Sequence, residues 1–282
     1  MPKLRKHKEF KPRKVVHKIP HGVSKEENEL ANAIALDFPG VAVTRSNRQV
    51  LKGRELDIYL PSRALAIEFD GNYFHDSKSK DISYHLHKTV ECEKQGIRLI
   101  HIFSDEWETK KHLVINHIRR ALGKYQTISA EDCIVRPISP SERKFFFDNS
   151  CLNGDDSRAT GSLGMYYKGD IVSAISYIEN RDTITILRYC DRPSIKVNSA
   201  LGEFLKEFKK DVEAIVDRRS SDGLDFKLEG FEIVEVTDPN PYYTKDYKKR
   251  IPWYEYKLSE STKEYTMIYD CGNIVMKKKT SS

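Results

Sequence analysis

The sequence lacks the features of membrane, secreted and zinc-finger proteins. No apolar run approaches the ~20 residues that a membrane-spanning helix needs. The five cysteines lie far apart, and none forms the Cys-x-x-Cys pair of structural zinc sites. Scattered cysteines favour a reducing compartment over a disulfide framework. The basic N-terminus has no apolar segment of the secretory type. These absences predict a soluble, cytoplasmic protein without a membrane partner.

The composition is typical of a globular protein on the polar side of average. Of the 282 residues, 39% are hydrophobic and 32% charged, a balance that supports a buried core. The length suits one large domain or two of ordinary size.

Positive charge is concentrated in residues 1–23. They contain six lysines and two arginines against the single acid Glu9, whereas the net charge of the whole chain is +6. Two early prolines and little apolar periodicity predict a flexible basic arm. Such an arm either contacts nucleic-acid phosphates or is a solvated tail. The residues that we expect to contact DNA are Lys3, Arg5, Lys6, Lys8, Arg13 and Lys14.

The remaining chain is predicted to form two α/β domains. The pattern of residues 24–125 predicts helices and strands in the order α-β-β-β-α-β-α. Ser24 and Glu27 have capping-box spacing at the start of the first helix. The predicted elements are a helix at 24–38, strands at 41–45, 55–61, 64–71 and 97–103, and helices at 83–95 and 106–122. We place the boundary near 125–130, and residues 126–282 predict a second domain with helices at 140–148 and 198–209.

Carboxylates interrupt two apolar strands of the first domain. Asp57 lies within ELDIYLP, and Glu68 and Asp70 lie two apart within ALAIEFDG, so the latter two share a strand face. Acids in such surroundings need partners, and Mg²⁺ is the natural one because it takes carboxylate oxygens as ligands. The alternatives are solvated acids on an edge strand and, for Asp70, a role in shaping the turn at Gly71.

Further polar residues follow these acids. His75 is a candidate general acid or base, or a surface loop histidine. His85 and Lys88 share a helix face, where they either assist at a phosphate or form an ordinary polar surface. Glu27 lies on the inward side of the first helix and is either catalytic or a capping residue.

The run GRELDIYLPSRALAIEFDGNYFHDSKSKDISYHLHKTVECEKQGIRLIHIFSDEW resembles phage homing endonucleases related to the very-short-patch-repair endonuclease, within the PD-(D/E)xK superfamily. The resemblance implies a restriction-endonuclease-like mixed sheet flanked by helices. It implies Asp57 and Glu68 as metal ligands, with Glu27 and His75 as further active-site residues. The sequence departs from the superfamily pattern at Asp70, where a lysine is expected, leaving His75, His85 or Lys88 to replace it. Tyr73 and Phe74 either insert into DNA or pack in a core.

The second half is similar to a phage nuclease-associated domain related to the acetyltransferase (GNAT) fold, through DNSCLNG, ILRYCDRP, VDRRSSDGLDFKLEGF and IYDCGN. An acetyltransferase cradles the pyrophosphate of acetyl-CoA in a glycine-rich loop that opens a helix. The equivalent stretch, RPSIKVNSALGEFL, lacks paired glycines before its helix. A DNA-contacting or specificity role is therefore favoured. Residues 242–257 mix basic and aromatic side chains. Either Lys248, Lys249 and Arg250 contact DNA, as we expect, or the segment is a twisted edge strand with a solvated face.

The leading hypothesis is a site-specific, Mg²⁺-dependent DNA endonuclease of phage type, acting in the cytoplasm of an infected bacterial host. Mn²⁺ is the alternative ion and double-stranded DNA is the expected partner. One active site per chain implies a monomer or a transient dimer on DNA. The alternatives are a strand-nicking mismatch-repair enzyme and, from another class, a non-catalytic DNA-binding or acyltransferase-like protein.

Overall fold

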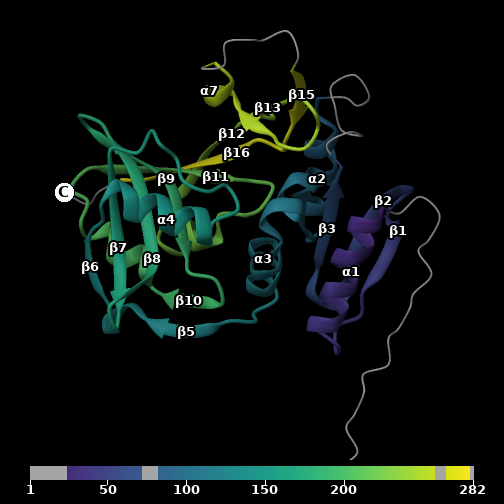
Figure 1. Ribbon diagram of the computed structural model, residues 1–282, viewed down its shortest axis with the longest axis horizontal. Coiled ribbons are helices and arrows are strands. Elements are labelled where there is room, and N and C mark those ends of the chain that lie inside the picture. Colours follow the sequence, from purple (N-terminus) through teal and green to yellow (C-terminus); the bar gives the residue numbers. More distant parts are fainter. Residues whose placement is uncertain (1–23, 72–81, 258–264, 280–282) are drawn as a thin grey trace, which may run out of the picture.

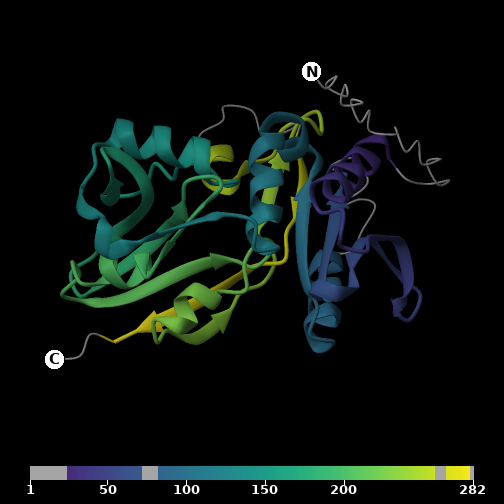
Figure 2. The same ribbon diagram turned by 90° about the horizontal axis from the view of Figure 1, so that it is seen from below.

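A computed structural model describes residues 24–71, 82–257 and 265–279 of the chain. These residues form a mixed α/β structure with two main sheets (Figure 1). The first sheet lies in the part drawn purple to blue, and the larger sheet in the part drawn teal, green and yellow. Helix α3 (Ser104–Ala121) lies between them in both ribbon views (Figure 1, Figure 2). The predicted α/β class is confirmed.

The first sheet has four strands in the order β1-β2-β3-β4. Strands β1 to β3 are antiparallel neighbours, and β4 runs parallel to β3. Every residue of β3 is buried, as expected for a central strand with an almost continuous apolar sequence. The strands are β1 (Thr44–Leu51), β2 (Arg54–Leu60), β3 (Leu65–Asp70) and β4 (Arg98–Phe103). The other helices of this part are α1 (Lys25–Asp37), α2 (Tyr84–Lys94) and the short 3-10 helix η1 (Pro61–Arg63).

The side chains of β3 alternate between two helical layers. Ile67 and Phe69 belong to the hydrophobic core formed with α1 and α3. Ala66 packs instead with Cys92 of α2. Because successive side chains of a strand point to opposite faces, Glu68 shares the face of Ala66. The acidic residues of β3 therefore lie on the α2 side of the sheet.

The larger sheet has seven strands in the order β12-β16-β11-β9-β8-β7-β6. Its only parallel pair is β11 with β9; the other neighbours are antiparallel. The strands are β6 (Ile134–Pro137), β7 (Gly161–Tyr167), β8 (Asp170–Glu179), β9 (Thr183–Asp191), β11 (Asp211–Asp217), β12 (Glu232–Val236) and β16 (Asn273–Lys278).

Shorter elements surround the larger sheet. One small sheet pairs β5 (Gln126–Ser129) with β10 (Ile195–Asn198), and another contains β13 (Pro241–Thr244), β14 (Ile251–Pro252) and β15 (Thr266–Tyr269). The helices are α4 (Pro140–Ser150), α5 (Ala200–Leu205), α6 (Leu224–Leu228), α7 (Trp253–Tyr256) and the 3-10 helix η2 (Ala130–Asp132).

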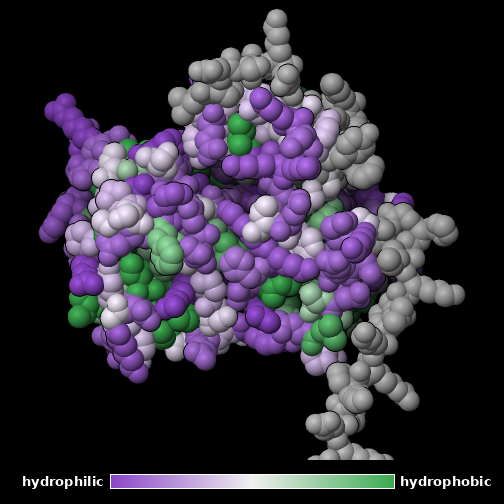
Figure 3. Space-filling view, in the orientation of Figure 1, coloured by the Kyte–Doolittle hydropathy of each residue, from purple (hydrophilic) through white to green (hydrophobic). Residues whose placement is uncertain are grey.

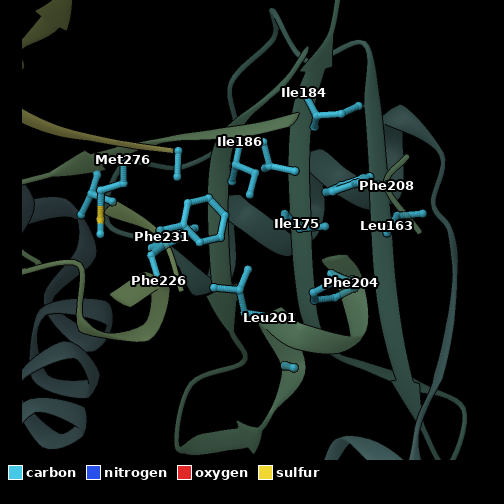
Figure 4. Packing of buried hydrophobic residues seen from close by; sticks show 14 of the residues in the cluster. Leu163, Ile175, Ile184, Ile186, Leu201, Phe204, Phe208, Phe226, Phe231 and Met276 are labelled. Carbon is cyan, nitrogen blue, oxygen red and sulfur yellow. The ribbon is translucent and has the colours of Figure 1, made fainter. Parts of the chain in front are cut away.

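Aromatic residues form much of the core on one face of the larger sheet. Phe204 and Phe226, from α5 and α6, pack with Ile175 and Ile186 of the strands (Figure 4). Large rings bury much apolar surface and stabilise a sheet whose covering helices are short. A smaller cluster that includes Phe147 of α4 packs against the same sheet.

Polar contacts join the two main sheets. The backbone N–H of His101 in β4 donates to the carbonyl oxygen of Arg219 at 2.9 Å. The buried guanidinium of Arg219 donates to Glu106 of α3 at 2.9 Å. Arg250 donates to Asp105 of the same helix at 2.8 Å. These contacts fix the C-terminal half against β4 and α3.

The structure corrects two local predictions. The strand expected at 41–45 lies further along, as β1. The helix expected at 198–209 is limited to α5, because Ser199 before it is left-handed with φ of 61° and the chain after Leu205 continues in short i+3 turns. Residues 126–140, for which the sequence predicts no strand, contain β5 and β6.

The outer surface is largely hydrophilic. Figure 3 shows polar residues over most of one face, with hydrophobic residues in small separate areas. Within the described ranges, no helix combines the length and apolarity that crossing a membrane requires.

Candidate metal centre

Polar side chains gather on the α2 face of the first sheet. Strands β2, β3 and β4 and helix α2 all contribute. The residues are Asp57, Glu68, Asp70, His85, Lys88, Thr89 and His101. All of them are buried except Asp57, which is half-buried. Because burying an unpaired charge costs several kcal/mol, the partners of each group determine what the cluster can do.

Glu68, Asp57 and Lys88 form one part of this cluster. The Lys88 ammonium donates to Oε1 of Glu68 in a buried ion pair. Oδ2 of Asp57 accepts the backbone N–H of Phe69 at 2.8 Å. Oε2 of Glu68 is buried and has no hydrogen-bond partner among the described residues. The prediction that Asp57 and Glu68 come from neighbouring strands agrees with the pairing of β2 and β3.

The group formed by Glu68, Asp57 and Lys88 has two acidic side chains and one basic side chain. Burial and the nearby Asp57 carboxylate raise the pKa of Glu68 to about 8. Burial also raises the pKa of Asp57 to about 6, although the Lys88 ammonium opposes the shift. The pKa of Lys88 is raised despite its burial, because Glu68 and Asp57 both stabilise its positive charge. One ammonium thus serves two carboxylates, and one of these retains its proton to an unusually high pH.

Glu27 adds a third carboxylate from α1. Its position follows from the helix start, where Oγ of Ser24 accepts the backbone N–H of Glu27 at 3.0 Å. Burial, followed by the repulsion of Asp57, raises the pKa of Glu27 to about 7. Arg45 lies 4.0 Å from Oε1 of Glu27 but does not hydrogen-bond to it. Glu27 thus supplies the backbone N–H that Ser24 caps, while its carboxylate interacts electrostatically with Asp57.

This donor set fits a cation that prefers oxygen ligands. Mg²⁺ takes one or two carboxylates and completes its shell with water or phosphate oxygens. Glu68 and Glu27 each have a buried oxygen without a hydrogen bond in the described part of the chain. A divalent cation beside Asp57 and Glu68 would satisfy the buried oxygen of Glu68 and cancel the repulsion that raises the carboxyl pKa values.

Asp70, His85 and His101 form the other part of the cluster. Oδ1 of Asp70 lies 3.3 Å from Nδ1 of His85, and Oδ2 lies 2.8 Å from Nδ1 of His101. One donor atom from each residue lies within 4.8 Å of the other two. Burial opposes protonation of His101, yet Cys271 and Asp70 raise its pKa well above the ordinary value. The buried carboxylate of Asp70 thus contacts two histidines in addition to ending strand β3.

His101 was not among the predicted site residues. It interrupts the apolar strand RLIHIF in the same way that Glu68 interrupts its neighbour. The parallel register pairs these two residues directly. A lone polar residue inside a predicted central strand is the signal that could have identified it.

Several predicted residues lie outside the described ranges. They are His75, Tyr73, Phe74 and the arm residues Lys3, Arg5, Lys6, Lys8, Arg13 and Lys14. Lys248 and Lys249 are exposed. Arg250, which was predicted to contact DNA, makes contacts with other residues of the protein. Its guanidinium pairs with Asp105 at 2.8 Å and lies 3.5 Å from the ring centre of Phe103.

The segment between β9 and α5 makes hydrogen bonds within the protein. Oδ2 of Asp191 accepts the backbone N–H of Val197 at 3.1 Å and a hydrogen bond from Arg120 at 2.7 Å. Strand β10, within this turn, pairs with β5. A backbone N–H shortly before α5 is therefore already bonded to a carboxylate, in the region where an anion-binding loop has free N–H groups.

No family model matches the chain, and no curated protein matches it. Solved structures similar to it include a GNAT family acetyltransferase from Elizabethkingia anophelis, with 13% identity over 53% of this chain and 99% of that one, at a TM-score of 0.34. The ribosomal-protein-S18-alanine N-acetyltransferase from Escherichia coli has 10% identity over 53% and 95%, at a TM-score of 0.33. An IAA acetyltransferase from Bacillus cereus has 12% identity over 52% and 99%, at a TM-score of 0.32.

These similar structures are acetyltransferases, and each match covers about half of the chain. The prediction of a Mg²⁺-dependent DNA endonuclease was wrong: the similar structures are acetyltransferases and not hydrolases. The PD-(D/E)xK and phage assignments have no support from them.

Proposed function

We propose that this chain is a DNA-binding protein with an acyltransferase-like domain, in which Asp57 and Glu68 hold Mg²⁺ beside the bound DNA. The observation that carries the proposal is the buried Oε2 of Glu68, which has no hydrogen-bond partner among the described residues. An orphaned carboxylate oxygen beside a second carboxylate is best satisfied by a hard cation.

Bound Mg²⁺ would attract a phosphate oxygen into its remaining coordination positions. Asp57 and Glu68 orient the ion, and Lys88 limits the negative charge that remains when both carboxylates ionise. Without the cation, the two carboxylates would repel a phosphate. DNA binding at this site is therefore expected to depend on the divalent cation.

Basic residues supply the second part of the proposed DNA contact. Residues 1–23 hold eight of the 48 basic residues of the chain and one of its 42 acids. Lys248 and Lys249 add exposed charge in the C-terminal half. Contacts of this kind release counterions from DNA, so the affinity should fall steeply with salt.

Acyl transfer is not proposed, because a carboxylate lies in the segment before α5. Asp191 accepts the N–H of Val197, and α5 is only six residues long. The negative charge of Asp191 would repel a phosphate group at this turn. The acyltransferase-like domain supports the DNA-binding part through the contacts of Arg219 and Arg250.

The test is fluorescence anisotropy of a labelled DNA duplex at fixed ionic strength, with Mg²⁺ or with EDTA. We expect Mg²⁺ to tighten binding by the wild type and to have no effect on the Asp57→Asn, Glu68→Gln double variant. Glu91→Gln is the matched control, because Glu91 lies on α2 and forms an exposed pair with Arg54. A gel run after each titration verifies that the duplex is intact, so that the anisotropy reports binding.

Two results would overturn the proposal. One is wild-type DNA binding that is equal in Mg²⁺ and EDTA. The other is a Mg²⁺ effect that survives in the double variant. Deleting residues 1–23 should weaken binding in both conditions while leaving the Mg²⁺ effect in place, which separates the arm from the cation site.

A further inference from the structure

A second set of metal-ligating side chains lies beside the proposed Mg²⁺ site. We propose that Asp70, His85 and His101 bind a transition-metal ion, for which Zn²⁺ is the best match, and that Cys271 supplies the fourth ligand. This site differs chemically from the first, since two imidazoles and a thiolate suit Zn²⁺ and not Mg²⁺. The inference does not rest on the proposed function.

The three ligand atoms already converge. The distances from Asp70 are 3.3 Å to Nδ1 of His85 and 2.8 Å to Nδ1 of His101. Zinc–ligand bonds of about 2.0–2.2 Å in a tetrahedron place neighbouring ligand atoms roughly 3.3 Å apart. A metal would therefore fit after small side-chain movements. All three residues are buried, so water competes poorly for the ion.

The hydrogen bonds of Thr89 fix the tautomer of His101. The Thr89 hydroxyl donates its proton to the carbonyl oxygen of His85 at 3.0 Å. It can therefore only accept from Nε2 of His101, which lies 2.9 Å away. With the proton on Nε2, the lone pair of a neutral His101 is on Nδ1, directed at Oδ2 of Asp70.

Two lone pairs facing each other at 2.8 Å repel unless positive charge lies between them. The charge is either a second proton on the imidazole or a metal ion. Metal-bound histidines commonly donate their other ring N–H to an oxygen, as His101 does to Thr89. The convergence of a His85 ring nitrogen on the same carboxylate favours the metal, because one ion coordinates Asp70, His85 and His101 together.

Cys271 brings the C-terminal half to this site. It is fully buried and lies close enough to His101 to raise the pKa of that imidazole. Hydrogen bonds hold the turn that contains Cys271. Oδ1 of Asp270 accepts the N–H of Gly272 at 2.7 Å and that of Asn240 at 2.6 Å. A metal held by β3, β4, α2 and this turn would join the two halves of the chain.

The test uses the full chain without a histidine tag, stripped with chelator and titrated with Co²⁺ as a spectroscopic substitute for Zn²⁺. We expect one equivalent to bind with the strong visible absorption of a tetrahedral site, and Zn²⁺ to displace it. His85→Gln and His101→Gln should each lower the affinity by at least about tenfold. His87→Gln is the matched control, because His87 is an exposed histidine on the same helix.

Cys271→Ser tests the fourth ligand separately. We expect this variant to lose the near-ultraviolet thiolate-to-cobalt band while keeping a weaker visible spectrum. Repeating the wild-type titration in excess Mg²⁺ should leave the tetrahedral spectrum unchanged, which distinguishes this site from the Mg²⁺ site. Circular dichroism verifies that each variant is folded.

The proposal is overturned if the folded wild type binds neither Co²⁺ nor Zn²⁺, because Asp70 and His101 then share a proton only. It is equally overturned if Co²⁺ binds with an octahedral spectrum that His85→Gln leaves unchanged. Should His101→Gln fail to fold, the wild-type and Cys271→Ser spectra decide the question alone. Bound Zn²⁺ should also raise the melting temperature of the wild type and not that of His85→Gln.

Discussion

Lys88 of α2 and Glu68 of β3 form a buried ion pair in which only one of the two carboxylate oxygens has a partner among the described residues. The ammonium contacts Oε1, and the nearby Asp57 draws on the same positive charge. This arrangement stabilises one carboxylate and leaves the second in need of a proton or a cation. Several measurable properties follow from that imbalance.

Replacing Lys88 should destabilise the fold in a pH-dependent way. Lys88→Met removes the partner of a buried carboxylate, and we expect a loss of about 3–5 kcal/mol in the free energy of unfolding at pH 8. The loss should be smaller at pH 5, because Glu68 is then protonated. Urea denaturation at both pH values measures it. Lys144→Met, at an exposed pair with Asp148, is the control and should cost about 0.5 kcal/mol or less. Equal losses at the two pH values would contradict the account.

Stability in EDTA should fall as the pH rises from 5 to 8. The pKa values of Glu68, about 8, and Glu27, about 7, exceed the ordinary value of 4.5. The folded chain therefore binds protons that the unfolded chain has released, so raising the pH through this window favours unfolding. The measurement is the thermal midpoint against pH for the wild type and Glu68→Gln. The variant should show a flatter curve, and parallel curves would refute the assigned shift.

Sequence patterns located the carboxylates well. The helix start at Ser24, the β2–β3 hairpin and the buried β3 strand all follow from local signals, and together they bring Asp57 and Glu68 onto neighbouring strands. Periodicity and capping are short-range, so they predict such elements without knowledge of the rest of the chain.

Long-range contacts were beyond those patterns. Strand β10 exists because it pairs with β5, which is some seventy residues away in the chain. Arg250 reads as a surface residue in a basic segment, yet Asp105 and Phe103 enclose it. The approach of Cys271 to His101 likewise depends on the packing of the two halves.

The junction between the halves should depend on Arg219. Its guanidinium is almost completely buried and pairs with Glu106 at 2.8 Å and Asp217 at 2.9 Å. Arg219→Met leaves both acids without this partner, and we expect a loss of about 3–5 kcal/mol together with faster limited proteolysis. Arg192→Met, at an exposed pair with Asp170, should change stability by less than about 1 kcal/mol. A loss as small as that of the control would show that the junction does not depend on this arginine.

Acetyl-CoA should not bind the chain saturably. Asp191 occupies the turn before α5 and would repel a phosphate there. Isothermal titration of acetyl-CoA into the protein, with a known acetyltransferase as positive control, checks this. Saturable binding with micromolar affinity would contradict the assignment and restore acyl transfer as a candidate activity.

The central claim is that Asp57 and Glu68 bind a divalent cation. Its most direct test is an anomalous difference map from crystals grown with Mn²⁺, compared with crystals of Glu68→Gln. The account predicts a peak in contact with the carboxylates of Asp57 and Glu68 in the wild type and its loss in the variant. A wild-type crystal saturated with Mn²⁺ that shows no peak at these carboxylates would contradict the claim.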